Sequence, residues 1–145
     1  MKKIILSIAA LVFTVAAMAQ QKIDSLIKMN TVNHNFGKIK QGVPVDVYFE
    51  ITNISDQPVV VENTSAPCGC TTPEKITEPI LPGKKAKFKV QYNAAAIAPF
   101  TKDINIKLAG LDQPKTVKIT GEVLTPEAYS TYVKEKSKTK DSKNN

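Results

Sequence analysis

Residues 45–53 read VDVYFEITN, and every second side chain from Val45 to Ile51 is apolar. The side chains between them are polar or charged, or amphipathic in the case of Tyr48. Successive side chains of a β-strand point to opposite faces of a sheet, so this alternation indicates one buried and one solvated face. The stretch therefore predicts a half-buried β-strand.

The same period of two recurs in three later stretches, residues 85–92, 103–108 and 116–123. Turn-forming residues separate these stretches, and a short β-branched run, Val59-Val60-Val61, precedes them. Six or seven short strands at this spacing, with no strong helical pattern between them, are typical of an antiparallel β-sandwich. We therefore predict a single all-β domain in which two sheets close on one core.

The N-terminus has the three features of a secretory signal. Lys2 and Lys3 precede an apolar run over residues 4–17, and Ala17-Met18-Ala19 then places small residues at a cleavage site. The run is too short to favour a membrane-spanning helix, and no cysteine stands at the cleavage point to carry a lipid anchor. We predict cleavage after Ala19 and an exported mature protein, periplasmic or extracellular, without a membrane span.

The domain organisation follows from these patterns. A polar lead-in, either a helical turn or a flexible arm, covers residues 20–30, and the sandwich covers 31–124. A C-terminal extension covers 125–145, with a turn of helix over 128–133. From about Lys134 the chain holds no apolar residue, so we predict a disordered, lysine-rich tail. Such a tail is either simply solvated or in contact with anionic surfaces.

Charge and composition exclude several classes of protein. The net charge is +7, but the leader contributes +2 and the tail from Lys134 contributes +3, so the predicted domain is close to neutral. The sequence holds no arginine, which argues against nucleic-acid binding because bidentate contacts to guanine and phosphate favour that residue. With one histidine and two cysteines, we expect no enzyme and no cofactor.

The chemically suggestive stretch is residues 66–73, APCGCTTP. Cys68 and Cys70 lie two residues apart, and the positive φ that glycine tolerates at Gly69 would bring them within disulfide range. A bridge closing so short a loop stabilises little, about 1.6 kcal/mol in the chain-entropy model. Three interpretations stay open: a tight packed corner with or without a bridge, thiol redox chemistry, and a soft metal such as copper held by Cys68, Cys70 and His34.

Four segments together resemble a bacterial family named domain of unknown function 1573. They are Asn33-His34-Asn35-Phe36-Gly37-Lys38-Ile39, Phe49-Glu50-Ile51-Thr52-Asn53, Cys68-Gly69-Cys70-Thr71 and Ile80-Leu81-Pro82-Gly83. The resemblance covers about residues 31–123 and implies an immunoglobulin-like sandwich of about seven strands on exported envelope proteins. It implies no established activity.

We interpret the motif residues as structural: His34, Phe36, Gly37, Asn53, Gly69, Thr71, Pro82 and Gly83. Phe36 is expected to fill the core, with His34 on the same face. Asn53 is expected to bond a loop backbone, and Pro82-Gly83 fits a type II turn.

Two functional hypotheses follow. The first is a non-catalytic, immunoglobulin-like binding or structural module of the bacterial cell envelope, whose partner is a protein or another envelope component. Tyr48, Lys85, Lys87 and Lys89 would face such a partner, and an extended segment could add as a strand to an exposed sheet edge. The alternative is a thiol-redox or copper-handling envelope protein that uses Cys68 and Cys70.

Overall fold

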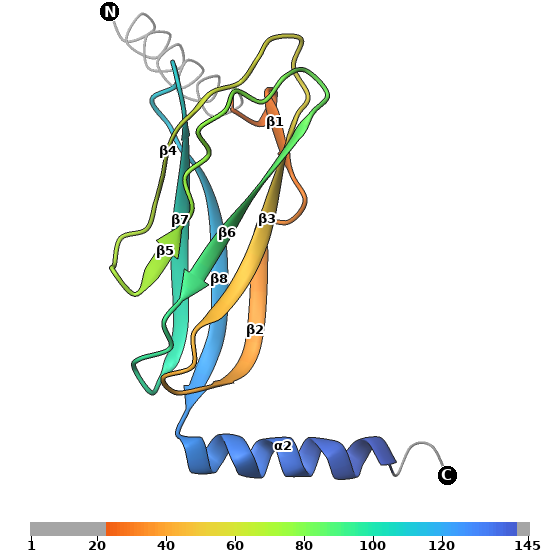
Figure 1. The fold of residues 1–145 in the computed structure, drawn as a ribbon, viewed down its shortest axis with the longest axis vertical. Coiled ribbons are helices and arrows are strands. Elements are labelled where there is room, and N and C mark those ends of the chain that lie inside the picture. Colours follow the sequence, from red (N-terminus) through yellow and green to blue (C-terminus); the bar gives the residue numbers. More distant parts are fainter. Residues whose placement is uncertain (1–22, 142–145) are drawn as a thin grey trace, which may run out of the picture.

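The computed structural model describes residues 23–141, which form a long two-sheet sandwich followed by one helix (Figure 1). The predicted signal peptide, residues 1–19, lies outside the described residues. Within 23–141, no helix is long and apolar enough to cross a membrane.

Two four-stranded sheets make up the sandwich. The first has the order β1 (Ile27–Met29), β3 (Val45–Asn53), β6 (Lys85–Tyr92), β5 (Thr71–Pro73). The second has the order β2 (Asn33–Lys40), β8 (Lys115–Leu124), β7 (Pro99–Leu108), β4 (Val61–Ser65). The predicted all-β sandwich is therefore confirmed, with eight strands in the described part of the chain.

One pair of strands is not antiparallel as the sequence predicted. β2 runs parallel to β8, with His34 opposite Ile119 and Ile39 opposite Val123. The cause is that the first extended part of the chain is shared between the sheets: β1 pairs with β3, and β2 then joins the other sheet. Side-chain alternation reports which face is buried and carries no information about the direction of a neighbouring strand.

The core consists of the inward residues of the alternating stretches. Phe49 and Phe88 stack across the first sheet with ring centroids 5.8 Å apart, and Ile119 in the second sheet is fully buried. The register places Phe49 directly opposite Phe88, so the two strands present their largest apolar side chains at the same level. Burial of these side chains is the main favourable term for a domain of this size.

The N-terminal boundary of the domain lies earlier than predicted. Ile23 and Ile27 are both buried in the core, and Leu26 packs against it, so the segment predicted as a lead-in is part of the sandwich. Its apolar residues lie at helix-like spacing, and the described chain starts with two helical residues, 23–24, followed by a turn before β1 begins at Ile27. The helical segment is short because residues 27–29 pair with β3 instead of continuing it.

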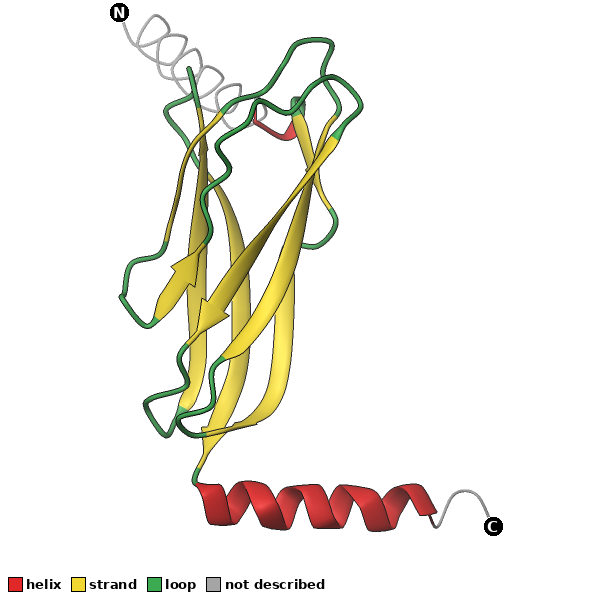
Figure 2. Cartoon of the chain, viewed as in Figure 1, coloured by secondary structure: helices red, strands yellow, loops and turns green. Residues whose placement is uncertain are grey.

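The predicted disorder of the tail is wrong over most of its length. α2 spans Pro126–Asp141 and extends away from the end of β8 (Figure 2). Thr125 caps its start, because its hydroxyl oxygen accepts the Ala128 N–H at 3.2 Å, and Pro126 at the first helical position needs no partner. Lysine, glutamate and serine continue the helix without a glycine or proline, so the missing apolar residues prevent burial but not helix formation.

Candidate functional site

The two cysteines form a disulfide on the loop that joins β4 to β5. Their α-carbons are 5.3 Å apart, and both residues are half-buried. The Thr71 hydroxyl lies 3.9 Å from the Cys68 sulfur and 3.8 Å from the Cys70 sulfur, and the Cys70 carbonyl accepts the Asn93 N–H. The prediction that Gly69 uses a positive φ is wrong, because the turn closes with Gly69 outside the left-handed region.

His34 does not join the cysteines in a metal site. It lies on β2 in the second sheet, where its ring packs edge-on against Phe36 with centroids 4.6 Å apart. Within residues 23–141, no three histidine, cysteine or acidic side chains are grouped closely enough to hold a metal ion. Phe36 is half-buried against the core and faces Phe100, while Gly37 has a φ of 67° at a bulge in β2.

The Asn53 side chain connects the end of β3 to two loops through hydrogen bonds. Its buried amide nitrogen donates to the carbonyls of Gln57 at 2.8 Å and Ile80 at 2.7 Å. Its amide oxygen accepts both the N–H and the hydroxyl of Ser55, at 2.9 and 2.7 Å. One side chain therefore bonds both the loop that follows β3 and the chain that leads into β6.

The turn at Pro82-Gly83 then starts β6. The Lys84 N–H donates to the Leu81 carbonyl at 2.9 Å across the turn, and Gly83 adopts a φ of 72°, as a type II turn requires at its third position. The Asn53 backbone bonds both Lys84 and Gly83. β6 therefore begins at a fixed position beside β3.

The other flank of β6 is only half covered. β5 pairs with residues 90–92, and the Glu74 N–H then donates to the Lys89 carbonyl while the Glu74 carboxylate accepts the Lys89 N–H. Beyond Glu74 the chain crosses toward β4: Thr64 donates to the Glu74 carbonyl, and Ile80 forms two backbone hydrogen bonds with Val59. In Figure 1 this segment runs up past β7 before it returns into β6.

Lys85 and Lys87 are left without backbone partners on this flank. Alternate residues of a strand direct their N–H and C=O groups to opposite sides, and Lys89 directs both toward Glu74. Lys85 and Lys87 therefore direct theirs to the same side, where no backbone or side-chain partner among residues 23–141 bonds them. We call this flank, residues 85–87, the open edge of β6.

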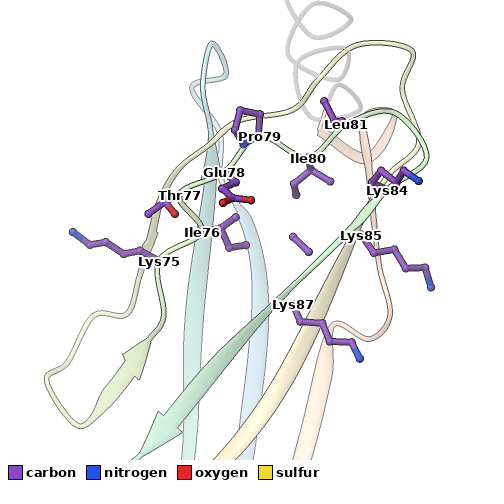
Figure 3. Close-up of a pocket in the computed structure, with 11 residues that line it drawn as sticks. Lys75, Ile76, Thr77, Glu78, Pro79, Ile80, Leu81, Lys84, Lys85 and Lys87 are labelled. Atoms are coloured by element: carbon purple, nitrogen blue, oxygen red, sulfur yellow. The ribbon is translucent and has the colours of Figure 1, made fainter.

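A groove of about 430 Å³ lies between the open edge and residues 75–81 (Figure 3). Its apolar lining includes Ile76, Ile80 and Ala86, and Ile80 is also a core residue. Four lysines line it together with one acid, and these are Lys75, Lys84, Lys85, Lys87 and Glu78. The groove therefore combines an apolar base, unpaired backbone groups and a positive rim.

The Lys85 and Lys87 side chains share one acidic neighbour on β3. The Lys85 ammonium lies 2.8 Å from a Glu50 carboxylate oxygen, and that of Lys87 lies 3.9 Å from the other. The Lys85 hydrogen bond lowers the pKa of the Glu50 carboxyl below its usual value of 4.5; partial burial opposes this shift, and the charges of both lysines add to it. Lys85 takes the close contact, so Lys87 is the less tightly paired lysine.

The sequence identified part of this surface. Lys85, Lys87 and Lys89 were predicted to face outward, and the first two are exposed, with side-chain exposures of 60% and 68%. Sequence reasoning missed Ile76, which lines the groove, and Glu74, which precedes it, and it named Ile80 only as part of a family motif. The available signal was Pro79, which cannot donate a backbone hydrogen bond and therefore argues against a continuous strand after β5.

Residues 27–123 match the family described as "Protein of unknown function (DUF1573)". The chain belongs to this family. The resemblance inferred from the sequence motifs is thus confirmed, and the match begins at β1 and ends in β8. No curated protein matches the chain.

Solved structures share the fold of this DUF1573 chain at low sequence identity. A protein of unknown function from Porphyromonas gingivalis W83 aligns with a TM-score of 0.59 and 14% identity, over 67% of this chain and 46% of that one. PapD-like domain 7 of human CEP192 aligns with a TM-score of 0.58 and 8% identity, over 70% and 87%. The Pseudomonas aeruginosa CupB2 chaperone aligns with a TM-score of 0.52 and 13% identity, over 66% and 55%.

These likenesses establish the fold and nothing finer. The chain spans less than half the length of the Porphyromonas protein. Neighbours of the PapD-like kind agree with an immunoglobulin-like sandwich, a fold that serves many unrelated functions. Function must therefore be argued from the groove and the loops of this chain.

Proposed function

We propose that this protein is a non-catalytic binding module of the bacterial cell envelope that holds an extended segment of a partner protein at the open edge of β6. The envelope assignment rests on the signal predicted at residues 1–19. The immunoglobulin-like fold supports a binding or structural role, because its sheets offer edges to which a further strand can pair.

The observation that carries the proposal is the unpaired backbone at Lys85 and Lys87. A free sheet edge is usually blunted by charged side chains such as lysine, by a bulge, by a proline or by a covering loop, because unpaired N–H and C=O groups recruit other chains. Here the covering chain follows β6 only as far as Lys89 and then leaves it. The groove beside this edge has a volume of about 430 Å³, and its lining includes Lys85, Ala86 and Lys87 of β6.

A photo-crosslinking side chain at position 87, introduced in living cells, tests this proposal. The matched control is position 107, where Lys107 is an outward lysine of β7 that pairs with Glu62 at 3.2 Å, as Lys87 pairs with Glu50. We expect a discrete crosslinked species in the envelope fraction from position 87 and none from position 107. Identical products from the two positions, or none from position 87, would contradict a binding role for this edge.

Thiol–disulfide exchange at Cys68–Cys70 is a second candidate function. It is favoured by the position of the disulfide on a connecting loop, with both cysteines partly accessible to solvent. In this reaction a partner thiolate attacks one sulfur, a mixed disulfide forms, and a second partner thiol releases it. The Cys68–Cys70 bond gains two electrons and two protons as the partner dithiol becomes a disulfide. Copper handling would first require this same reduction, because a bonded pair offers no thiolate.

Equilibration with glutathione distinguishes an exchanging disulfide from a structural one. Structural disulfides of exported proteins resist reduction by glutathione, whereas exchanging ones equilibrate with it. If Cys68–Cys70 takes part in exchange, thiol-specific alkylation followed by mass measurement will find both cysteines labelled at intermediate ratios of reduced to oxidised glutathione. A pair that stays unlabelled across the whole range excludes the redox function and leaves the binding proposal intact.

A further inference from the structure

The residues that already pair with the β5 flank of β6 indicate which side chains suit the positions beside that strand. We call these successive positions the row. This row starts with β5, in which Thr71, Thr72 and Pro73 lie opposite Tyr92, Gln91 and Val90. The next position, opposite Lys89, is occupied by Glu74, whose carboxylate lies 3.7 Å from the Lys89 ammonium. The first position at the border of the open edge is therefore an acid paired with a lysine.

The same spacing continues into the groove. Lys85, Lys87 and Lys89 are alternate residues on the outward face of β6, so the next outward positions of the row lie opposite Lys87 and Lys85. The position between them lies opposite Ala86, on the side of the groove that Ile76 and Ile80 line. A strand filling the row would thus present acidic, apolar and acidic residues in succession.

Charge favours the same pattern. The groove is lined by four lysines and Glu78, and even after Glu50 on β3 is included the excess is two positive charges. Lys87 is 68% exposed, and its contact with Glu50 is long at 3.9 Å. A carboxylate on the far side of β6 would give Lys87 a cross-strand partner of the kind that Lys89 already has.

We propose that the partner segment is an acidic, extended peptide with the pattern acid–apolar–acid, which pairs antiparallel to the open edge of β6 and continues the row begun by β5. The backbone groups of Lys85 and Lys87 would provide the main-chain hydrogen bonds, and their ammonium groups would provide the selectivity for acids. This inference rests on the proposed function and adds the chemistry of the partner.

Binding of short synthetic peptides to the full chain tests this chemistry. One labelled peptide alternates glutamate with valine, a second has lysine in place of glutamate, and a third keeps the glutamates but has proline in place of valine. By fluorescence anisotropy we expect the first to bind about tenfold or more tightly than either control, because the second lacks the charge and the third cannot form a strand. Backbone NMR shifts on binding should be centred on residues 85–87.

Variants of the protein localise the effect. Lys87→Glu should weaken binding of the acidic peptide about fivefold or more, and Lys107→Glu should leave it unchanged. Lys87→Pro removes an N–H that no other described residue accepts, so it should abolish binding while the β6 ladder with β3 is retained. If Lys87→Pro lowers the melting temperature strongly, Lys87→Glu alone decides the outcome.

The possible outcomes distinguish a failure of the proposed partner chemistry from a failure of the proposed binding function. Equal affinity for the acidic and lysine peptides, or equal losses in Lys87→Glu and Lys107→Glu, would overturn the acidic pattern. If position 87 still crosslinks to a protein in cells, the proposed function survives that result and only the partner chemistry fails. Concentration-dependent dimers that Lys87→Pro abolishes would instead identify the occupant as a second copy of this chain, and would likewise overturn the acidic peptide.

Discussion

The two flanks of the first half of β6 differ in whether the rest of the chain forms hydrogen bonds with them. On the β3 flank, the Asn53 backbone bonds Gly83 and Lys84, its side chain bonds the Ile80 carbonyl, and the strand pairs with β3 from Lys85 onward. On the other flank, the chain covers β6 only from Lys89 onward. The open edge is therefore held on a fixed strand and is not the frayed end of the sheet. A fixed edge loses less conformational freedom when a partner pairs with it.

The largest expected effect comes from breaking the closed flank with Asn53→Ala. Four hydrogen bonds of a buried amide are lost, and we expect the free energy of unfolding to fall by about 3 kcal/mol. Denaturant unfolding measures this change. Asn63→Ala is the matched control, because Asn63 is an exposed residue of β4 and its loss should cost less than about 0.5 kcal/mol.

The same variant tests whether the closed flank positions the open one. If the Asn53 hydrogen bonds hold the start of β6, acidic-peptide binding by the folded Asn53→Ala protein should also weaken. Unchanged affinity in that variant would show that the open edge is positioned by the β3 pairing alone.

A smaller effect is expected from overpacking the opposite sheet at Gly121. A Cβ at this position would lie 2.8 Å from two ring atoms of Phe100 and 2.9 Å from the Gly37 carbonyl oxygen. We expect Gly121→Ala to cost about 1–2 kcal/mol, since the Phe100 ring or the β2 bulge must move. Gly69→Ala is the control, because a Cβ there meets nothing within 4 Å and the φ is ordinary.

Peptide binding should respond differently from stability in this case. Gly121 lies in the sheet that does not contain β6, so Gly121→Ala should leave the affinity for the acidic peptide unchanged. A loss of affinity as large as that of Asn53→Ala would show that the open edge depends on overall stability and not on its own flank.

The same contrast explains how far the sequence could be interpreted. Alternation in residues 45–53 and 85–92 predicted both strands and their buried faces, because burial of every second side chain is a local property. The partner of Asn53 was predictable only as "a loop", since Ile80 lies 27 residues further along the chain. The open edge depends on where the chain stops following β6, which is set by the contacts of Glu74 with Thr64 and of Ile80 with Val59.

The errors at the two ends of the domain have a related cause. Residues 27–29 form a strand by pairing with β3, a contact distant in sequence, so their local pattern indicated the helical residues 23–24 but not the strand that follows. α2 shows the reverse: its structure comes from a local cap and from helix-compatible residues, whereas the prediction of disorder considered only the absence of a buried face.

The smallest expected effect concerns Glu50, the residue of β3 whose carboxylate contacts both lysines of the open edge. Because the folded protein lowers the pKa of Glu50, the stability contributed by its ionised form is present above the usual value of 4.5 and is lost as the pH falls through the lowered value. Glu50→Gln should therefore lower the melting temperature slightly near neutrality, leave it almost unchanged at pH values below the lowered pKa, and so flatten its dependence on pH below about 4.5. The same variant frees the Lys85 and Lys87 ammonium groups from their β3 partner, so the acidic peptide should bind somewhat more tightly at pH 7. Thermal melts across this pH range and one anisotropy titration measure the two effects, and a weaker affinity in Glu50→Gln would show that Glu50 positions the lysines for the partner and does not compete for them.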